Sequence, residues 1–233
     1  MKPAPNNDRL ELLRQQFDKL KNSSLHFDDF KFGSGKKVWW KCPKADDHIW
    51  EASIVKRIDG GNCPMCAGRL IVNSNCLLTT HPFLAAEWHP TNNGNLKPEN
   101  VYGGSERKVW WTCPNGTDHE YEAQIKHRIA GGGCPICNGK KVVLSNSVAT
   151  THPSLISEWH PTKNIGLSIN NFVAGSDKIV WWFCKANPLH EWKTSVNNRS
   201  SKKHGCPYCK LTPQSKQELT ILFELKSIFP SIN

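Results

Sequence analysis

The stretch VWWKCPKADDHIW, residues 38–50, places two tryptophans beside a cysteine and follows them with a histidine. Two further stretches repeat it, VWWTCPNGTDHEY at 109–121 and VWWFCKANPLHEW at 180–192, each displaced by 71 residues. A repeat at a fixed period identifies the structural unit, so it has to be recognised before any single residue is interpreted. The chain is therefore predicted to contain three copies of one module.

Each copy continues in the same way after its histidine. A stretch of 14 or 15 residues leads to CPMC (63–66), CPIC (134–137) or CPYC (206–209). Nine of the ten cysteines belong to this pattern. The tenth, Cys76, has Ser147 at its place in the next repeat, so we expect a small buried side chain there.

Three cysteines and one histidine in each repeat are the ligand set of a structural zinc site. Zn²⁺ takes four ligands in a tetrahedron, and a C-x2-C turn lets two thiolates converge on one ion. All four ligands would come from the protein, which leaves no open position for catalysis. We therefore predict three structural Zn²⁺ ions. Their ligands would be Cys42, His48, Cys63 and Cys66 in the first repeat, Cys113, His119, Cys134 and Cys137 in the second, and Cys184, His190, Cys206 and Cys209 in the third.

A disulfide framework is the competing interpretation of ten cysteines. The chain shows neither a signal peptide nor a stretch hydrophobic enough to span a membrane, and the recurring histidine has no role in a disulfide. We expect an intracellular protein, cytoplasmic or nuclear, without membrane association. Each module has about 40 residues, too few for a large core, so zinc binding should supply part of the free energy of folding.

The paired tryptophans permit two interpretations. Neighbouring strand residues point to opposite faces, so Trp39 and Trp40 cannot cover the same side of a hairpin. Either both members of each pair belong to a core, or one is exposed and stacks on a nucleic-acid base. A domain this small needs large apolar side chains to build any core, which favours the first interpretation.

The segments between the modules repeat as well, as TTHPFLAAEWHPTNN (79–93) and TTHPSLISEWHPTKN (150–164). Prolines near both ends predict a two-turn helix whose leucine and tryptophan dock on the neighbouring hairpin. LELLRQQFDK (10–19) stands one period earlier, so an N-terminal helix over Arg9–Lys21, with Asp8 as N-cap, is predicted to be a diverged copy. We expect the linker histidines to cap and pack rather than to bind metal.

The charge of the chain predicts the class of partner. It carries 30 Lys+Arg against 20 Asp+Glu, a formal net charge of +10. Nine thiolates and three Zn²⁺ together contribute three negative charges, which leaves about +7. A basic balance of this kind favours nucleic acid as the partner. The charge is uneven, at +4 for residues 31–69, +1 for 102–140 and +5 for 173–211.

Basic residues recur at two positions of the repeat, one just before each tryptophan pair and one in the turn before each C-P-x-C. Arginine matches phosphate with a planar pair of donors. The competing interpretation is an arginine that caps its turn under a solvated basic surface, and both stay open. With two lysines of the longer third loop, the predicted nucleic-acid contacts are Lys36, Arg57, Arg107, Arg128, Lys178, Arg199, Lys202 and Lys203.

The pattern VWWxCxxxxxHxWxxxxxxRxxGxxCPxC, followed by TTHPxLxxEWHPT, resembles the treble-clef or zinc-ribbon domain that occurs in tandem arrays in bacteria and viruses. The resemblance covers about residues 25–210. It implies treble-clef-like zinc modules with a nucleic-acid-binding role and carries the ligands over at the positions named above. The third module departs slightly, because Lys185 replaces the proline after its first cysteine and its second loop is one residue longer.

The resemblance gives the expected organisation. We predict small α+β zinc modules, three tandem treble-clef or zinc-ribbon-like repeats with a period of 71, joined by short helices and flanked by a helix at each end. The predicted boundaries are 1–24 for the N-terminal helix, 25–70, 96–141 and 167–211 for the zinc modules, 71–95 and 142–166 for the linker helices, and 212–233 for the C-terminal helix.

Members of this family often precede a nuclease domain similar to very-short-patch-repair or PD-(D/E)xK enzymes. Residues 212–233 have helical spacing and an S-x-x-E capping box at Ser215 and Glu218, and they resemble the opening helix of such a domain. The competing interpretation is a terminal helix that packs on the third module. No Asp…Glu-x-Lys core is present, so we expect no DNA hydrolysis by that mechanism from this chain. No motif of the sequence indicates a small-molecule substrate either.

Two function classes stay open. The first is a zinc-dependent nucleic-acid-binding array, most readily DNA-binding, that targets a nuclease domain. The alternative is a zinc-stapled protein–protein interaction module, because a fold does not fix a function.

Overall fold

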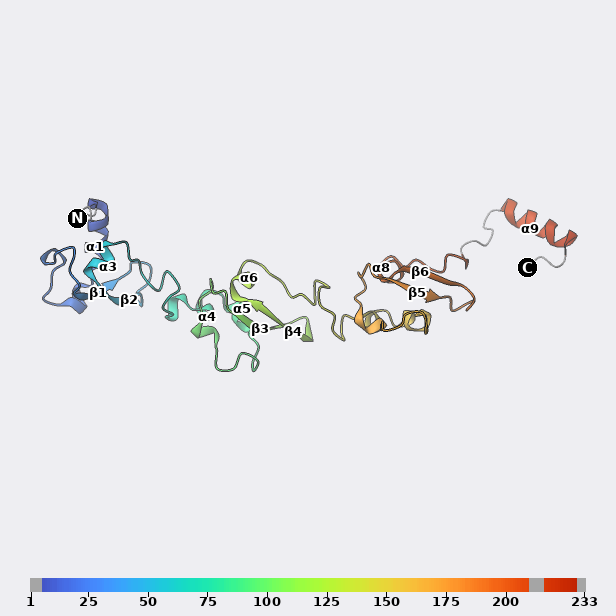
Figure 1. Cartoon of the computed structure of the whole chain (residues 1–233), viewed down its shortest axis with the longest axis horizontal. Helices are drawn as coiled ribbons and strands as arrows, with labels where there is room; N and C mark the ends of the chain where they lie inside the picture. Colours follow the sequence, from blue (N-terminus) through green and yellow to red (C-terminus); the bar gives the residue numbers. More distant parts are fainter. Residues whose placement is uncertain (1–5, 210–215, 230–233) are drawn as a thin grey trace. The chain divides into compact units, whose positions relative to one another are not determined.

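The three Val-Trp-Trp stretches form the first strands of three two-stranded antiparallel hairpins (Figure 1). The computed structural model describes residues 6–209 and 216–229 and forms two compact units, Met1–Gly133 and Cys134–Asn233. The predicted class of small α+β repeats is confirmed. The hairpins are β1 (Lys37–Lys41) with β2 (Ile49–Ser53), β3 (Lys108–Cys113) with β4 (Gly116–Gln124), and β5 (Ile179–Phe183) with β6 (Glu191–Ser195).

Strand alternation separates the two tryptophans of each pair. The second members, here called the inner tryptophans, are fully buried: Trp40, Trp111 and Trp182. The first members, the outer tryptophans, are partly exposed: Trp39, Trp110 and Trp181. The core interpretation is therefore confirmed for the inner members, while the outer members lie on the opposite face of each hairpin.

Each inner tryptophan is held by the strand opposite. In the first hairpin Trp40 faces Trp50, and its indole N–H donates a 2.9 Å hydrogen bond to the carbonyl of Ala52. The same bond recurs at 3.1 Å from Trp111 and at 3.2 Å from Trp182. A buried indole thus satisfies its only donor, and the repeat keeps this arrangement in all three copies.

A short helix follows the second strand of every hairpin: α3 (Ile54–Ile58), α6 (Ile125–Ile129) and α8 (Val196–Arg199). The first residue of each helix is fully buried, and its backbone N–H donates to the residue that precedes the first strand. In the first copy Ile54 donates to the carbonyl of Lys36 at 3.2 Å. This bond fixes the loop before the hairpin against the helix after it.

The linkers contain short helices that differ in length from the prediction. The first linker has η2 (Asn73–Asn75), α4 (Leu77–Thr80), α5 (Pro82–Ala86) and η3 (Pro98–Asn100), and the second has α7 (Val148–Thr151), η4 (Pro153–Glu158) and η5 (Ile169–Asn171). The prolines do open α5 and η4, as predicted. The predicted two-turn length is wrong for the first linker, where α5 has only five residues. In the second linker η4 does have two turns, but it is a 3-10 helix of six residues.

The linker tryptophans dock on the inner tryptophans, which confirms the predicted packing. The rings of Trp88 and Trp111 meet edge to face with centroids 5.5 Å apart. Trp159 and Trp182 repeat this contact at 5.4 Å. Aromatic pairs of this geometry add stabilisation beyond the burial of area. Each linker therefore belongs structurally to the hairpin that follows it.

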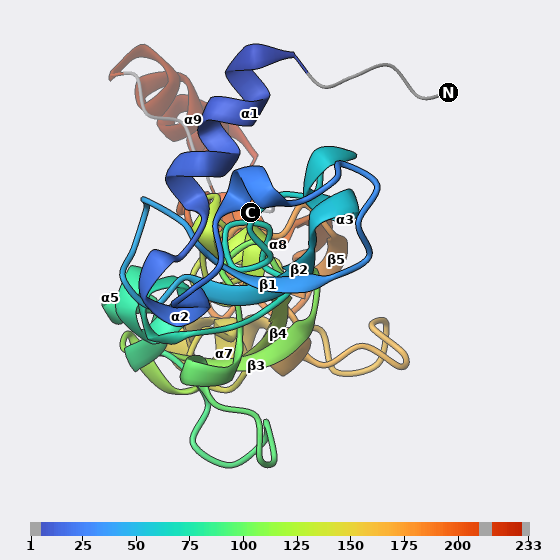
Figure 2. The same cartoon turned by 90° about the vertical axis from the view of Figure 1, so that its left-hand side faces the viewer.

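The N-terminal segment has the same role, although its predicted boundaries are wrong. Helix α1 (Asn7–Gln16) is capped by Asn6 rather than Asp8, and the chain is extended at Phe17 before α2 (Lys19–Asn22). Phe17 leaves the helix because it pairs with Trp40, at a ring distance of 6.0 Å. It thus takes the place of Trp88 and Trp159, as expected of a diverged copy. Helix α1 packs on α3, and Figure 2 shows it above the hairpin β1–β2.

Aromatic and aliphatic side chains form a small core around the first and third hairpins. In the first unit Leu13, Phe27, Met65 and the 3-10 helix η1 (Phe27–Asp29) complete the core around Trp40. In the second unit the corresponding cluster is Val148, Leu155, Ile169, Val180, Trp182, Trp192 and Val196. Cys76 is buried at 1 % exposure and Ser147 at 0 %, which confirms the prediction for that position.

Helix α9 (Lys216–Ile228) agrees with the helical spacing predicted for the last segment. Its predicted capping residue Ser215 lies outside the described residues, as does the side chain of Glu218. Among residues 6–209 and 216–229, no helix combines the length and the apolar character needed to cross a bilayer.

Candidate metal centres

The predicted ligands gather in three groups, and in each group the four ligand atoms lie within 4.8 Å of one another. This confirms the clustering on which the prediction of three zinc sites rests. The groups are Cys42, His48, Cys63 and Cys66; Cys113, His119, Cys134 and Cys137; and Cys184, His190, Cys206 and Cys209.

The distances within the first group fit a tetrahedral zinc ion. The Sγ atoms of Cys42 and Cys66 are 3.7 Å apart, and His48 Nδ1 lies 3.6 Å from the Sγ of Cys63 and 3.5 Å from that of Cys66. With Zn–S near 2.3 Å and Zn–N near 2.0–2.1 Å, a tetrahedron has edges of about 3.8 Å between sulfurs and about 3.6 Å between sulfur and nitrogen. The donor set therefore matches Zn²⁺ in size as well as in chemistry.

The third group has the same dimensions. Cys184 and Cys209 are 3.6 Å apart at Sγ, and His190 Nδ1 lies 3.6 Å from Cys206 Sγ and 3.5 Å from Cys209 Sγ. The second loop of this module, which is one residue longer, thus still places its cysteines beside the other two ligands. In both groups Nδ1 faces the sulfurs, so Nε2 would carry the ring proton when the metal is bound.

The disulfide alternative is excluded by the state of the thiols. All ten cysteines, which lie within residues 6–209, are free of disulfides. Sulfurs 3.6–3.7 Å apart are far beyond the S–S bond length of about 2.05 Å.

Crowding of the thiols shows why a cation belongs among them. Burial, with further contributions from Cys42 and Cys63, raises the pKa of the Cys66 thiol to about 12. Hydrogen bonding with Cys184 and Cys206 is the main cause that raises the pKa of Cys209 to about 11. Several thiolates are therefore unfavourable together without a counter-charge, and a bound dication supplies it.

Two local turns place the ligands of the first module. The backbone N–H of Cys42 donates to the carbonyl of His48 at 2.9 Å, which closes the knuckle at the end of the hairpin. The second knuckle is closed by Ala67 N–H, which donates to the Cys63 carbonyl at 3.1 Å. Cys184 and His190 repeat the first of these bonds at 2.9 Å.

The middle module builds its first knuckle differently, because β4 begins at Gly116 and pairs with Cys113. A Cβ atom at Gly116 would stand 2.6 Å from the ring of His119. Glycine there lets the chain pass close to a ligand, whereas the other modules have Ala45 and Asn187 at that position.

The turn arginines, Arg57, Arg128 and Arg199, lie inside the modules and not on their surface. Their exposed fractions are 1 %, 8 % and 8 %. Each stacks on the aromatic side chains of its hairpin, and Arg57 lies 4.9 Å from the ring centroid of Trp40. Each guanidinium also donates to a carbonyl at the end of its turn and to a side chain of the preceding linker. Of the two interpretations left open for these arginines, burial favours the structural one.

The linker partner of the arginine differs between modules. Arg128 pairs with Glu87 and Arg199 with Glu158, whereas Arg57 has the neutral Gln16. Burial, with Arg9 nearby, lowers the pKa of Arg57 to about 10. The first module therefore buries a guanidinium without the carboxylate that balances it in the other two.

The remaining predicted contacts are exposed. Lys36, Arg107 and Lys178, called here the loop cations, lie in the loop before each hairpin, and Lys202 and Lys203 lie in the third turn. The loop that carries each loop cation is ordered by a serine two residues earlier, whose hydroxyl accepts the backbone N–H of the cation at 3.2–3.3 Å. The cations thus project from a fixed backbone.

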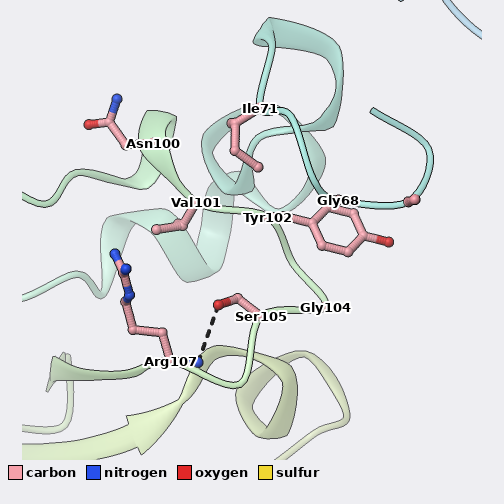
Figure 3. Close-up of a pocket in the computed structure, with 9 residues that line it drawn as sticks. Gly68, Ile71, Asn100, Val101, Tyr102, Gly104, Ser105 and Arg107 are labelled. Carbon is pink, nitrogen blue, oxygen red and sulfur yellow. Dashed lines mark hydrogen bonds between the residues drawn. The ribbon is translucent and has the colours of Figure 1, made fainter. Parts of the chain in front are cut away.

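One loop cation borders a cavity of about 320 Å³ within the first unit (Figure 3). Tyr102 forms one wall, and a Cβ atom on Gly68 or Gly104 would stand 2.3 Å or 2.6 Å from its ring. Arg107 extends into the opposite side, and the dashed line marks its backbone bond to Ser105. Two glycines therefore seat the tyrosine ring, and the cavity leaves the guanidinium accessible.

Sequence reasoning missed a set of clamp asparagines, Asn22, Asn93 and Asn164. Each side-chain amide accepts the backbone N–H of an outer tryptophan at 2.8–2.9 Å and donates to its carbonyl at 2.8–2.9 Å. The three asparagines stand 71 residues apart, and the same residue type at one repeat position is the sequence signal that could have revealed them.

Two linker histidines cap the chain, as predicted. His89 Nδ1 accepts the backbone N–H groups of Thr91 and Asn92 at 3.3 and 3.1 Å, and His160 does the same for its own linker. Within the described residues, none of the metal-binding groups includes them.

Comparison with known proteins agrees with this geometry. A family model described as "Probable Treble clef zinc finger domain" matches three times, at residues 13–69, 84–140 and 155–212. Each match begins inside the preceding linker, where the docking tryptophan or phenylalanine lies. A search of the curated proteins found no match.

Proposed function

The chain belongs to this family of treble clef zinc finger domains, in three tandem copies, and on that premise we propose that it is a zinc-dependent DNA-binding array. The observation that carries the proposal is a cation at the same exposed, backbone-fixed position of every repeat, on a chain with a formal net charge of +10. Zinc would hold the modules folded, and the loop cations would contact phosphates.

The charge distribution refines the proposal. The formal charge is +4 over residues 31–69 and +5 over residues 173–211, but only +1 over the corresponding residues 102–140 of the middle repeat. The second strand of the middle hairpin carries three acidic residues, Asp118, Glu120 and Glu122. Glu106, in the loop before the hairpin, pairs with Lys126 at 2.7 Å. We therefore assign the main phosphate contacts to Lys36, Lys178, Lys202 and Lys203, with Arg107 as a weaker one. The buried turn arginines are not part of this surface.

The test is a titration of a random-sequence DNA duplex with the zinc-loaded chain at several salt concentrations. Counterion release predicts a steep fall of affinity with salt, and each lost phosphate contact should reduce the slope of log affinity against log salt by about 0.9. Lys36→Ala and Lys178→Ala should reduce the slope more than Arg107→Ala, their matched control at the same repeat position. An affinity that does not change with salt concentration, or the absence of binding at low salt, would contradict the proposal.

A zinc-stapled protein-interaction module is the second candidate. It is favoured by large apolar side chains that the described residues of the last segment leave exposed, among them Phe223 at 78 % and Ile228 at 65 %. The predicted nuclease domain and the intracellular location remain predictions that rest on the resemblance and on composition.

A further inference from the structure

The outer tryptophans have unequal electrostatic surroundings, although they occupy one repeat position. Two ammonium groups lie over the ring of Trp181, Lys163 at 4.5 Å and Lys193 at 4.8 Å from its centroid. Trp39 has one, Lys21 at 4.2 Å. The ring and its lysines together form a partly exposed, cationic aromatic surface on the outer face of the hairpin.

The middle repeat has replaced both lysine positions. Asn92 stands where the other repeats have Lys21 and Lys163, and Glu122 stands opposite Trp110 where Lys193 stands opposite Trp181. The first repeat is intermediate, because Glu51 faces Trp39 across the hairpin. The cationic character of the outer face therefore decreases from the third repeat to the first and then to the second.

The outer ring is fixed in position before any partner binds. Asn164 holds the backbone of Trp181 with two hydrogen bonds of 2.9 Å, and the His160 ring meets the indole edge to face at 6.4 Å. Lys163 also pairs with Glu191, whereas the side chain of Lys193 is exposed. A preorganised aromatic side chain loses little freedom when a ligand stacks on it.

A ring of this kind beside ammonium groups suits single-stranded nucleic acid. A base in a duplex has its faces covered by its neighbours, whereas an unpaired base can stack on an aromatic side chain while the adjoining phosphates meet cations. An ammonium over an exposed ring is held less strongly than a stacked base, so the base can displace it toward a phosphate.

We propose that Trp181 is a base-stacking residue for single-stranded nucleic acid, with Lys193 and Lys163 as its phosphate contacts. Trp39 with Lys21 forms a second, weaker site, and Trp110 forms none. This inference rests on the proposed function and specifies the form of nucleic acid that the array prefers.

The experiment compares the zinc-loaded chain with Trp181→Leu, Trp181→Phe and Trp110→Leu variants. Each is titrated with a fluorescent oligothymidine and with a duplex of the same length. Loss of one stacked base predicts that Trp181→Leu weakens single-strand binding about tenfold, with a smaller loss on the duplex. Trp181→Phe should restore part of the affinity, and Trp110→Leu should change neither titration. Zinc content and melting temperature are measured for every variant.

Lys193→Glu provides a test that leaves the ring in place, since it introduces the residue of the middle repeat at an exposed position. It should weaken single-strand binding, whereas Glu122→Lys should not. Equal losses from Trp181→Leu and Trp110→Leu, or no loss from Trp181→Leu, would overturn the inference. Salt-dependent duplex binding without preference for the single strand would overturn it and leave the proposed function intact, while binding to neither would contradict both.

Discussion

The carboxylate of Glu87, at the end of the linker helix α5, forms an ion pair with the guanidinium of Arg128, 41 residues further along the chain in the following hairpin module. The arginine side chain is 7 % exposed and the glutamate 25 %. Glu158 and Arg199 repeat the pair in the third module, and Gln16 and Arg57 repeat its geometry without the negative charge. The linker is thus tied to its module by charge as well as by aromatic packing.

The uncharged partner in the first module leads to a prediction. Gln16→Glu should stabilise the first module by about 1 kcal/mol, because a hydrogen bond to a charged group is stronger than one between neutral groups. It should also raise the pKa of Arg57 above its present value of about 10. The reverse change, Glu87→Gln, should cost the middle module about 1–3 kcal/mol. Denaturant unfolding of both variants checks this, and shifts of the same sign would contradict it.

The clamp asparagines should matter for stability although they are not metal ligands. Asn93→Ala removes a 2.8 Å bond from the Trp110 N–H and a 2.9 Å bond to its carbonyl. The Trp110 carbonyl still accepts the backbone N–H of His89 at 3.1 Å, so the backbone N–H of Trp110 is the group left unpaired. We expect a loss of about 1–3 kcal/mol. Asn92→Ala, at an exposed neighbouring position, is the control and should be close to neutral.

The two tryptophans of a pair should differ in their contribution to folding. Trp40 has 0 % exposure, and Trp40→Ala should cost about 3–5 kcal/mol. Trp39 is partly exposed, so Trp39→Ala should cost clearly less. Thermal unfolding of the two variants under identical zinc loading makes the comparison. Equal costs would mean that both rings serve the core.

Loss of one ligand should act locally. Cys113→Ser should unfold the middle module and leave the first and third folded, since repeats are stabilised by themselves and by their neighbours. Hydrogen exchange measured along the chain should show lost protection around β3 and β4, while protection around β1 and β5 persists. Loss of protection in all three hairpins together would instead indicate one cooperative unit.

The metal ligands could be predicted from the sequence because a zinc site needs cysteines and histidines at a characteristic spacing. The same spacing occurs in three copies, which identifies the ligands more securely than a single copy would. The first and last residues of the helices were harder to predict. Helix α1 ends at Gln16 because Phe17 is drawn to Trp40, a contact between segments that helical propensity does not register.

The role of the turn arginines could not be decided from the sequence for a similar reason. An arginine is a residue type that commonly contacts phosphate, and the sequence offers three of them in the turns, Arg57, Arg128 and Arg199. Only the fold shows that each one contacts a linker side chain 41 residues earlier in the chain. Burial then separates these arginines from the loop cations, although both sets recur with the same period of 71.

The metal content of the purified chain tests the account most directly. Native mass spectrometry should find three zinc ions per chain, one for each group of ligands. Removal of zinc by a strong chelator should abolish the folded hairpins, because the free energy of metal binding is part of the free energy of folding. A content near one zinc ion per chain, or a chain that stays folded after complete removal of zinc, would contradict the three-site account.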